Sequence, residues 1–350
     1  MLLTKRFGAV FTALIAIAAL AALAMHSTAK GARPGVVVKR PISYLTATSS
    51  FNIEVIDEQG SSSITVNRDT PGSYPRWSPD GLRIGGYYKW LGTDNAIMAM
   101  SPSGANEQVV LTEGEFLAWN LSRGVLDSTR FNFFSSNCWL GTDAIIFTGS
   151  TTYLGAGGQT LTDSRLFIVG ATGIITPLTE LAPHAATWDF DPHWSNARNK
   201  VVFAGGRGGS ASPELYTINP DGTGLQQITN FGGSVSNLHW PVWSPAGDRI
   251  VVALRPAGSY WQLWILDVDL TKLNPVTAMH PFKVVDGGGG YVQTPAWSPD
   301  GKRIVFSRTV YDSRNRRFFE LVIANAASGA ETVIKRSSSN IELPDWNPVP

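Results

Sequence analysis

The chain is almost without cysteine, since Cys138 is the only one among its 350 residues. A single cysteine excludes an internal disulfide, and Cys138 lies too far from the N-terminus to accept a lipid after signal cleavage. A chain of this length can bury a core large enough to dispense with disulfide bonds. We therefore expect Cys138 to be a small buried apolar residue beside Trp139.

Charge is also sparse and almost balanced. Charged residues make up 16% of the chain, and the formal net charge at pH 7 is +1. Proteins that bind nucleic acids normally carry a clustered basic excess. A nucleic-acid partner is therefore not expected.

The common signatures of catalytic sites are missing as well. The sequence has no Gly-X-Ser-X-Gly nucleophile elbow and no Gly-X-X-X-X-Gly-Lys-Ser/Thr phosphate loop. It has no His-Glu-X-X-His motif and no cysteine pair that could hold zinc. These absences favour a non-enzymatic protein over an enzyme.

A long apolar run occurs only at the N-terminus. Lys5 and Arg6 precede an uncharged apolar run, 7–25, which small and polar residues follow. This order is typical of a secretory signal, so residues 1–29 are predicted to be a signal peptide. The run approaches the length of a membrane span, and an uncleaved N-terminal anchor is the alternative. Either interpretation predicts an exported protein, periplasmic or extracellular, with residues 30–41 as a linker. Membrane contact is expected only through the N-terminal segment, and only if that segment is not cleaved.

What the chain does contain is glycine, proline and tryptophan, at 35, 21 and 12 residues. One phrase recurs, Pro75-Arg76-Trp77-Ser78-Pro79-Asp80-Gly81, with close copies at 241–247 and 295–301 and degenerate ones at 138–143, 192–195 and 344–348. Its tryptophans lie 49 to 62 residues apart and are Trp77, Trp139, Trp194, Trp243, Trp297 and Trp346. A tryptophan at such intervals is typical of β-propeller repeats.

Each copy of the phrase predicts a β-hairpin. Pro-X-Trp-Ser forms a short strand, Pro-Asp-Gly forms a tight turn, and the apolar run after it forms the return strand. A second hairpin follows in each unit, with strands such as 96–100 and 215–218. Four strands joined in this way are one propeller blade.

The two ends of the chain predict how the ring closes. Segments 42–48, 51–56 and 63–66 are predicted strands that no Trp-Ser strand precedes, whereas 343–346 is a first strand that nothing follows. Together they complete one blade and leave no exposed sheet edge. We therefore predict an all-β fold, a closed six-bladed β-propeller over residues 42–350 whose last blade is completed by both chain termini.

The repeat resembles a known family. Trp297-Ser298-Pro299-Asp300-Gly301 leads into a basic residue and Ile-Val-Phe, and Asn219-Pro220-Asp221-Gly222-Thr223-Gly224 leads into a closing Ile-Thr pair. This pattern looks like the TolB-type β-propeller repeat and covers roughly residues 42–350. The resemblance implies the fold, since the motif residues are turn formers and core tryptophans. TolB proteins carry an α/β domain before the propeller, which this sequence lacks between the predicted signal and Ile42. Similar propellers also accompany prolyl oligopeptidase-like peptidases.

A few residues could hold a metal ion. Asp189 and Asp191 have a spacing that calcium binding or acid–base chemistry could use, and two histidines lie close to repeat tryptophans. The metal candidates are His184, Asp189, Asp191, His193 and His239. Loop and strand-start residues of this kind are more often solvated or hydrogen-bonded. No cofactor is therefore expected, and a divalent metal at the channel mouth is the alternative.

A partner-binding surface is predicted on the face from which the longer connections emerge. These connections are 87–95, 149–164, 205–213, 255–261 and 308–318, and the insertion 113–137 is expected to be a latch over the same face. Aromatic residues and arginine are enriched at interaction hot spots. The predicted binding residues are Tyr87, Tyr88, Trp90, Trp188, Arg207, Trp240, Arg255, Tyr260, Trp261, Tyr291, Arg314, Arg316 and Arg317.

The leading hypothesis is a monomeric, non-enzymatic binding or scaffold protein of the cell envelope. Its long-loop face would engage a protein, a peptide or a glycan. One alternative is a metal-dependent six-bladed propeller enzyme of the lyase or lactonase type. Another is a peptidase-associated propeller that acts in trans.

Overall fold

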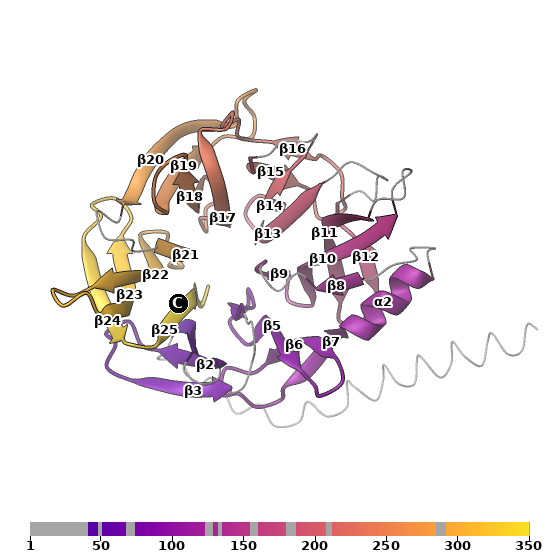
Figure 1. The fold of residues 1–350 in the computed structure, drawn as a ribbon, viewed down its shortest axis with the longest axis horizontal. Coiled ribbons are helices and arrows are strands. Elements are labelled where there is room, and N and C mark those ends of the chain that lie inside the picture. Colours follow the sequence, from indigo (N-terminus) through magenta and orange to yellow (C-terminus); the bar gives the residue numbers. More distant parts are fainter. Residues whose placement is uncertain are drawn as a thin grey trace, which may run out of the picture. The chain divides into compact units, whose positions relative to one another are not determined.

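The computed structural model describes residues 41–47, 51–67, 74–122, 129–131, 135–154, 160–179, 187–207, 212–284 and 292–349. They belong to one compact unit, Arg40–Pro350. The predicted signal peptide and most of the predicted linker lie outside these ranges. Within them, no helix has the length and apolar character needed to cross a bilayer. The unit consists almost wholly of β-strands, which Figure 1 shows as sheets arranged around a common centre.

The two ends of the unit share one sheet, whose strand order is β25-β1-β2-β3. Its strands are β1 (Ile42–Ala47), β2 (Phe51–Ile56), β3 (Ser63–Asn67) and β25 (Asn340–Trp346). Strand β25 runs antiparallel to β1, with Ile42 opposite Trp346. The predicted pairing of the first and last strands is therefore confirmed.

Three further sheets follow the predicted four-strand order along the chain. The first contains β4 (Arg76–Trp77), β5 (Ile84–Trp90), β6 (Asn95–Met100) and β7 (Gln108–Thr112). The second contains β17 (Val235–Trp243), β18 (Arg249–Pro256), β19 (Gln262–Val268) and β20 (Val276–Val284). The third contains β21 (Val292–Trp297), β22 (Arg303–Tyr311), β23 (Arg317–Asn325) and β24 (Glu331–Ser337).

The remaining strands form one nine-stranded sheet. They are β8 (Thr129–Phe131), β9 (Cys138–Leu140), β10 (Ala144–Leu154), β11 (Thr160–Gly170), β12 (Ile175–Pro177), β13 (Trp188–Ser195), β14 (Lys200–Gly206), β15 (Glu214–Ile218) and β16 (Gln226–Gln227). Strands β11 and β13 meet in parallel through a single residue pair, Ser164 opposite Trp188. The sheet thus divides into two antiparallel groups, β8–β12 and β13–β16. In the first group, β8 and β9 pair with different parts of β10, so the inner strand beside Trp139 is in two pieces.

The insertion predicted to be a latch contains helix α2 (Glu113–Leu121). Thr112 and Glu115 form a capping box at its start, which satisfies backbone N–H groups of the first turn. Phe116 is fully buried against Phe147 and Phe167. Figure 1 shows the helix at the rim of the molecule, so its described part packs on the edge of a sheet and not over the centre.

A left-handed residue precedes the proline in four of the inner strands. Asp191, Trp240, Thr294 and Leu343 have φ values of 53°, 53°, 48° and 56°. The pairing register shifts around each of them, which marks a β-bulge. Side chains rarely adopt this conformation, least of all a β-branched one such as Thr294. Each bulge changes the direction of its strand, so the residues before the bulge and the residues after it face different parts of the molecule.

Neighbouring sheets are joined by a repeated contact on the Pro-Asp-Gly side. Arg83, Arg249 and Arg303 lie over the rings of Trp139, Trp297 and Trp346, at 4.6, 4.7 and 4.8 Å from the ring centroids. In each case the arginine follows the turn of one unit and the tryptophan belongs to the next. A cation over an indole face is attracted by the ring quadrupole, so the motif stabilises the contact between units.

Several predicted connections are shorter than expected because the strands run on. Strands β10 and β11 occupy most of 149–164, and β22 and β23 leave only 312–316 of the predicted 308–318 connection. Residues 87–90 belong to β5. The prediction of long loops there was wrong, because turn-forming residues mark where a chain reverses and not how far its strands continue.

Candidate functional site

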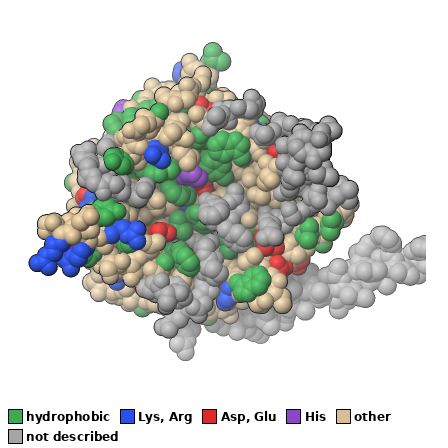
Figure 2. All heavy atoms as spheres, in the orientation of Figure 1, with side chains coloured by type: hydrophobic (Ala, Val, Ile, Leu, Met, Phe, Trp, Pro, Cys, Tyr) green, Lys and Arg blue, Asp and Glu red, His purple; other side chains and the backbone are tan. Residues whose placement is uncertain are grey.

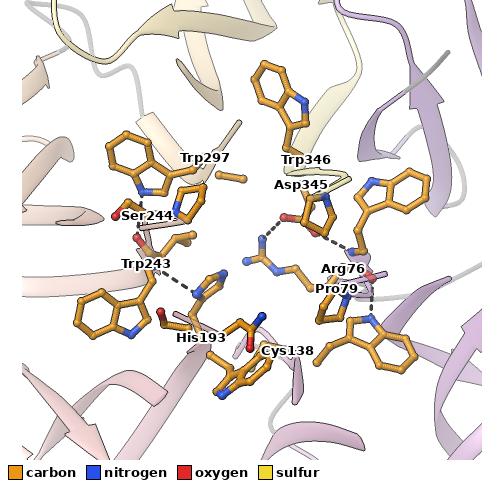
Figure 3. Close-up of a pocket in the computed structure, with 18 of the residues that line it drawn as sticks. Arg76, Pro79, Cys138, His193, Trp243, Ser244, Trp297, Asp345 and Trp346 are labelled. Atoms are coloured by element: carbon orange, nitrogen blue, oxygen red, sulfur yellow. Dashed lines mark hydrogen bonds and ion pairs between the residues drawn. The ribbon is translucent and has the colours of Figure 1, made fainter. Parts of the chain in front are cut away.

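The inner strands surround a cavity of about 300 Å³. Its walls come from all six Trp-containing phrases, together with prolines such as Pro79, Pro245 and Pro299. Figure 3 shows these residues arranged around a central space, with the rings of Trp243, Trp297 and Trp346 directed away from it. We call this space the axial pocket. Its volume is at the lower end of the range found for small-molecule sites.

The residue before each tryptophan gives the axial pocket its chemistry. In order along the chain these residues are Arg76, Cys138, His193, Val242, Ala296 and Asp345, and all six line the cavity. Asp345 lies on β25, in the sheet of β1–β3, and Arg76 lies on β4, which begins the sheet that comes next in the chain. The last of the six residues is therefore a neighbour of the first. One arc of the pocket is therefore polar, from Asp345 through His193, and the other arc is apolar.

Hydrogen bonds fix the polar side chains to neighbouring units. The Arg76 guanidinium donates to Asp345 Oδ1 at 3.4 Å, and the Trp77 N–H donates to Asp345 Oδ2 at 2.7 Å. The Trp243 N–H donates to His193 Nδ1 at 3.3 Å. With Nδ1 accepting, the neutral imidazole of His193 carries its proton on Nε2. Figure 3 shows Arg76 and His193 pointing toward the middle of the pocket.

Burial sets the protonation of this arc. Desolvation, with a smaller effect of the Arg76 charge, lowers the pKa of His193 to about 3. Desolvation raises the pKa of the Cys138 thiol to about 12, and it raises the pKa of Asp345 although Arg76 opposes that rise. At neutral pH His193 is a neutral imidazole and Cys138 is a thiol.

A second cluster is built of aromatic rings around His239. Phe190 and His239 come directly before the bulges at Asp191 and Trp240, whereas the pocket residues His193 and Val242 come after them. The His239 ring is 4.8 Å from Phe190, 5.1 Å from Trp240 and 5.7 Å from Trp261, between ring centroids. Trp188 stacks on Phe190 at 5.4 Å. We call these residues the aromatic cluster. Figure 2 shows hydrophobic side chains gathered around a histidine near the middle of one face.

Asp191 holds the aromatic cluster in place. Its side chain is fully buried, and Oδ2 lies 2.7 Å from His239 Nδ1 and accepts from the Trp240 N–H at 3.1 Å. Oδ1 accepts from the Ser136 N–H at 2.7 Å. The carboxylate acts as an acceptor throughout, so His239 carries its proton on Nδ1. Asp191 thus links three consecutive units and fixes the orientation of the imidazole.

Asp189 is tied to a different partner. Arg207 Nη2 lies 2.8 Å from Asp189 Oδ1 and 2.7 Å from Oδ2, and the same guanidinium lies over the Tyr216 ring. Burial raises the pKa of Asp189 to about 6, and the attraction of Arg207 limits the rise. Arg207 was predicted to bind a partner, but its contacts show that it neutralises a buried carboxylate.

Two predicted binding residues are wrong. Tyr87 and Tyr88 are fully buried within β5, at 0% and 1% exposure. The Tyr87 hydroxyl donates to Glu107 at 2.8 Å, and the Tyr88 hydroxyl donates to Asn137 at 3.2 Å. Their hydroxyls are satisfied inside the protein while their rings fill the space between sheets.

The other predicted binding residues are spread over the molecule. Trp90 and Tyr260 are about half exposed, at 52% and 51%. The four predicted arginines at turns near strand ends are exposed, namely Arg255, Arg314, Arg316 and Arg317. Three of them make local contacts, Arg255 with Ser259, Arg316 with Asp312 and Arg317 with Phe319. Tyr291 and the metal candidate His184 lie outside the described residues. Of the predicted set, Trp188, Trp240 and Trp261 are the ones that the structure brings into the aromatic cluster.

The remaining metal candidates lie in different settings. Asp189 pairs with Arg207, Asp191 pairs with His239, and His193 lines the axial pocket. Across the described ranges, no group of three or more His, Cys, Asp or Glu side chains is arranged to hold a metal ion.

Comparisons with known proteins bear on the fold. No family model matches the chain. A curated protein of Agrobacterium fabrum, the uncharacterized protein Atu1656, is 24% identical over 264 residues, which are 67% of this chain and 83% of that protein. Among solved structures, TolB from Acinetobacter baumannii has a TM-score of 0.61 at 17% identity and covers 88% of this chain. The match spans 66% of the Acinetobacter protein.

This chain has a TolB-like β-propeller fold. Hydrazine synthase from Kuenenia stuttgartiensis also matches, with a TM-score of 0.58, 14% identity and coverage of 88% of this chain and 46% of that one. At such identities the similarity concerns the fold alone, because one fold serves many functions.

Proposed function

We propose that the protein is an exported, closed six-bladed β-propeller that acts by binding a protein or peptide partner. Six Trp-containing inner strands and the pairing of β25 with β1 support the blade count and the closure. The basic, apolar and small-residue order of segment 1–29 supports export. The TolB-like fold supports a scaffold role, since propellers present a broad surface around a central axis.

The aromatic cluster is the observation that carries the binding proposal. Trp188, Trp240 and Trp261 are partly buried, so each keeps some accessible area through which it can contact a partner. The bulge at Trp240 holds its backbone in the left-handed conformation that also precedes the proline of three other inner strands, and the Trp240 ring lies 5.1 Å from that of His239. Rigid aromatic rings beside an oriented imidazole provide both apolar contact and a hydrogen-bonding group for a partner.

The proposal is tested by crosslinking in intact cells that express the full chain, followed by recovery of the tagged protein. A Trp261→Ala variant should lose the crosslinked partner, and the purified pair should bind about 30-fold more weakly, as expected for an interface hot spot. Mass spectrometry identifies the partner, and protease treatment distinguishes a polypeptide from a glycan. A glycan would contradict the proposed partner class.

Trp90→Ala is the matched control. Trp90 is also an exposed tryptophan at a strand end, but it belongs to β5, in a different sheet from the strands of the aromatic cluster. Binding should survive this change. Equal loss in both variants would show that the cluster is not the binding site, and thermal unfolding of each variant checks that the fold is intact.

A further inference from the structure

The axial pocket presents more hydrogen-bond donors than acceptors. Within the described residues, the Arg76 guanidinium has one hydrogen-bond partner, Asp345, at the long distance of 3.4 Å. His193 uses Nδ1 to accept from the Trp243 backbone N–H, which leaves its Nε2–H to donate to a ligand in the pocket. Both Asp345 oxygens already accept hydrogen bonds, from Arg76 and from the Trp77 N–H.

The hydroxyl groups that line the pocket do not change this balance. Ser244 Oγ donates to Asp248 at 2.8 Å, and Ser195 Oγ accepts from the Arg198 N–H at 3.3 Å. The side chains of Arg76 and Asp345 are 8% and 14% exposed, so a ligand in the pocket would meet them in a largely desolvated place. Charge-assisted hydrogen bonds are strongest in such surroundings.

The opposite arc is apolar. Val242 and Ala296 face the cavity there, and both are almost fully buried. Trp243 and Trp297 are also among the residues that line the cavity. A ligand that fits both arcs needs an anionic acceptor group at one end and a short apolar body at the other.

We propose that the axial pocket is a binding site for a small carboxylate with a short apolar tail. The carboxylate accepts hydrogen bonds from the Arg76 guanidinium and from His193 Nε2–H, and the tail packs against Val242 and Ala296. Arg76 is suited to this role because its planar fork matches the two carboxylate oxygens. The site is separate from the aromatic cluster and does not depend on the proposed partner.

The test compares three ligands with one carbon skeleton, by calorimetric titration of the full chain. They are 3-methylbutanoate, the neutral 3-methylbutanamide and the cationic 3-methylbutylamine. The carboxylate should bind about tenfold more tightly than the amide, since hydrogen bonds to a charged group are the stronger ones, and the amine should not bind. Equal binding of all three, tighter binding of the amine, or no binding of the carboxylate would overturn the proposal.

Two substitutions assign the site within the chain. Arg76→Met should weaken carboxylate binding about tenfold or more, because it removes the charged donor. Asp345→Asn should strengthen binding several-fold, because it removes the negative charge that competes for Arg76 while its amide oxygen still accepts from the Trp77 N–H. A role of Asp345 in packing alone predicts no such gain, so weaker or unchanged binding in this variant contradicts the proposed arrangement.

The matched control is Arg249→Met, since Arg249 stacks on Trp297 but does not line the pocket. Carboxylate binding should be unchanged in it. If Arg76→Met fails to fold, the double variant Arg76→Met with Asp345→Asn removes the unpaired buried charge. Carboxylate binding in that double variant equal to the wild type would also overturn the proposal.

Discussion

At the scale of single residues, the position before each repeat tryptophan decides what the axial pocket can do. The tryptophan and the turn that follow it are constrained by packing, whereas this one side chain faces the cavity. Its six occupants range from arginine to alanine, and they carry nearly all the ionisable chemistry at the axis. Burial then decides which of them are charged, as it does for the neutral His193.

Replacing His193 with glutamine should flatten the acid dependence of stability. The pKa of His193 is about 3 in the folded state and about 6.5 when unfolded, so the unfolded state binds the proton more readily. The stability that this neutral histidine contributes is complete above pH 6.5 and is lost as the pH falls from there toward 3. Urea unfolding at pH 7 and pH 5 should show the wild type losing about 1 to 2 kcal/mol more than His193→Gln.

His280→Gln provides the control for this comparison, because His280 has a side chain that is 61% exposed and an exposed aspartate partner. The His280→Gln variant should lose the same free energy of unfolding between pH 7 and pH 5 as the wild type. Asp345 acts in the opposite direction, since burial raises its pKa and favours the folded state on acidification, but that contribution is common to the compared proteins. Identical losses in the wild type and His193→Gln would contradict the assignment.

The sequence predicted some site residues and missed others for physical reasons. Trp188, Trp240 and Trp261 could be found because large aromatic residues placed before or between strands are conspicuous. Arg76 and Asp345 were missed, although aligning the six phrases and comparing the residue before each tryptophan would have singled them out. The contact of Asp191 with His239 joins residues 48 positions apart across two units, and no local pattern encodes it.

At the scale of elements, the helix α2 shows what the repeat cannot predict. The inner strand beside Trp139 is in two pieces, and α2 covers the adjoining part of the sheet with Phe116. Phe116 stacks on Phe131 of β8 at 5.9 Å and meets Phe147 edge-on at 5.1 Å. The repeat predicted four similar strands here, because an insertion that replaces part of a strand does not follow the repeat's own pattern.

Gly149→Ala should destabilise the protein by about 1 to 3 kcal/mol, the usual cost of overpacking. A Cβ at this position would lie 2.4 Å from the Phe116 ring and 2.9 Å from the Phe167 ring. Denaturant unfolding measures the loss, and Phe116→Leu in the Gly149→Ala background should recover part of it. Gly170→Ala is the control in the neighbouring strand β11, where a Cβ would meet nothing within 4 Å and stability should not fall. Equal effects of the two substitutions would contradict the close packing of α2.

At the scale of the whole molecule, contacts between successive sheets continue across the chain ends. Arg198 Nε donates to the Gly247 carbonyl, and Arg249 donates to the Gly301 carbonyl in the same way. Arg303 pairs with Glu58 at 2.6 Å, and the Asn347 side chain donates to the Gly81 carbonyl at 3.3 Å. The sheet that contains both chain ends thus contacts the β21–β24 sheet and the β4–β7 sheet through polar side chains, as sheets that follow one another in the chain also do.

If the proposed closure stabilises every sheet, removing the residues after Pro344 should lower the free energy of unfolding by far more than the loss of one strand end would. The deletion removes Trp346, which is 4% exposed, together with Asp345 and Asn347, each of which contacts the β4–β5 hairpin. Loss of a buried tryptophan alone costs about 3 to 5 kcal/mol, a large part of the stability of a typical domain. Calorimetry should show a lower Tm and a broader transition, since sheets on both sides of the gap lose a neighbour.

Truncation after Pro348 is the control, because it keeps Asp345, Trp346 and Asn347 and removes the exposed Val349. The Tm of this shorter deletion should stay near that of the full chain. An unchanged transition after the longer deletion would mean that the sheets are held by their sequential neighbours alone.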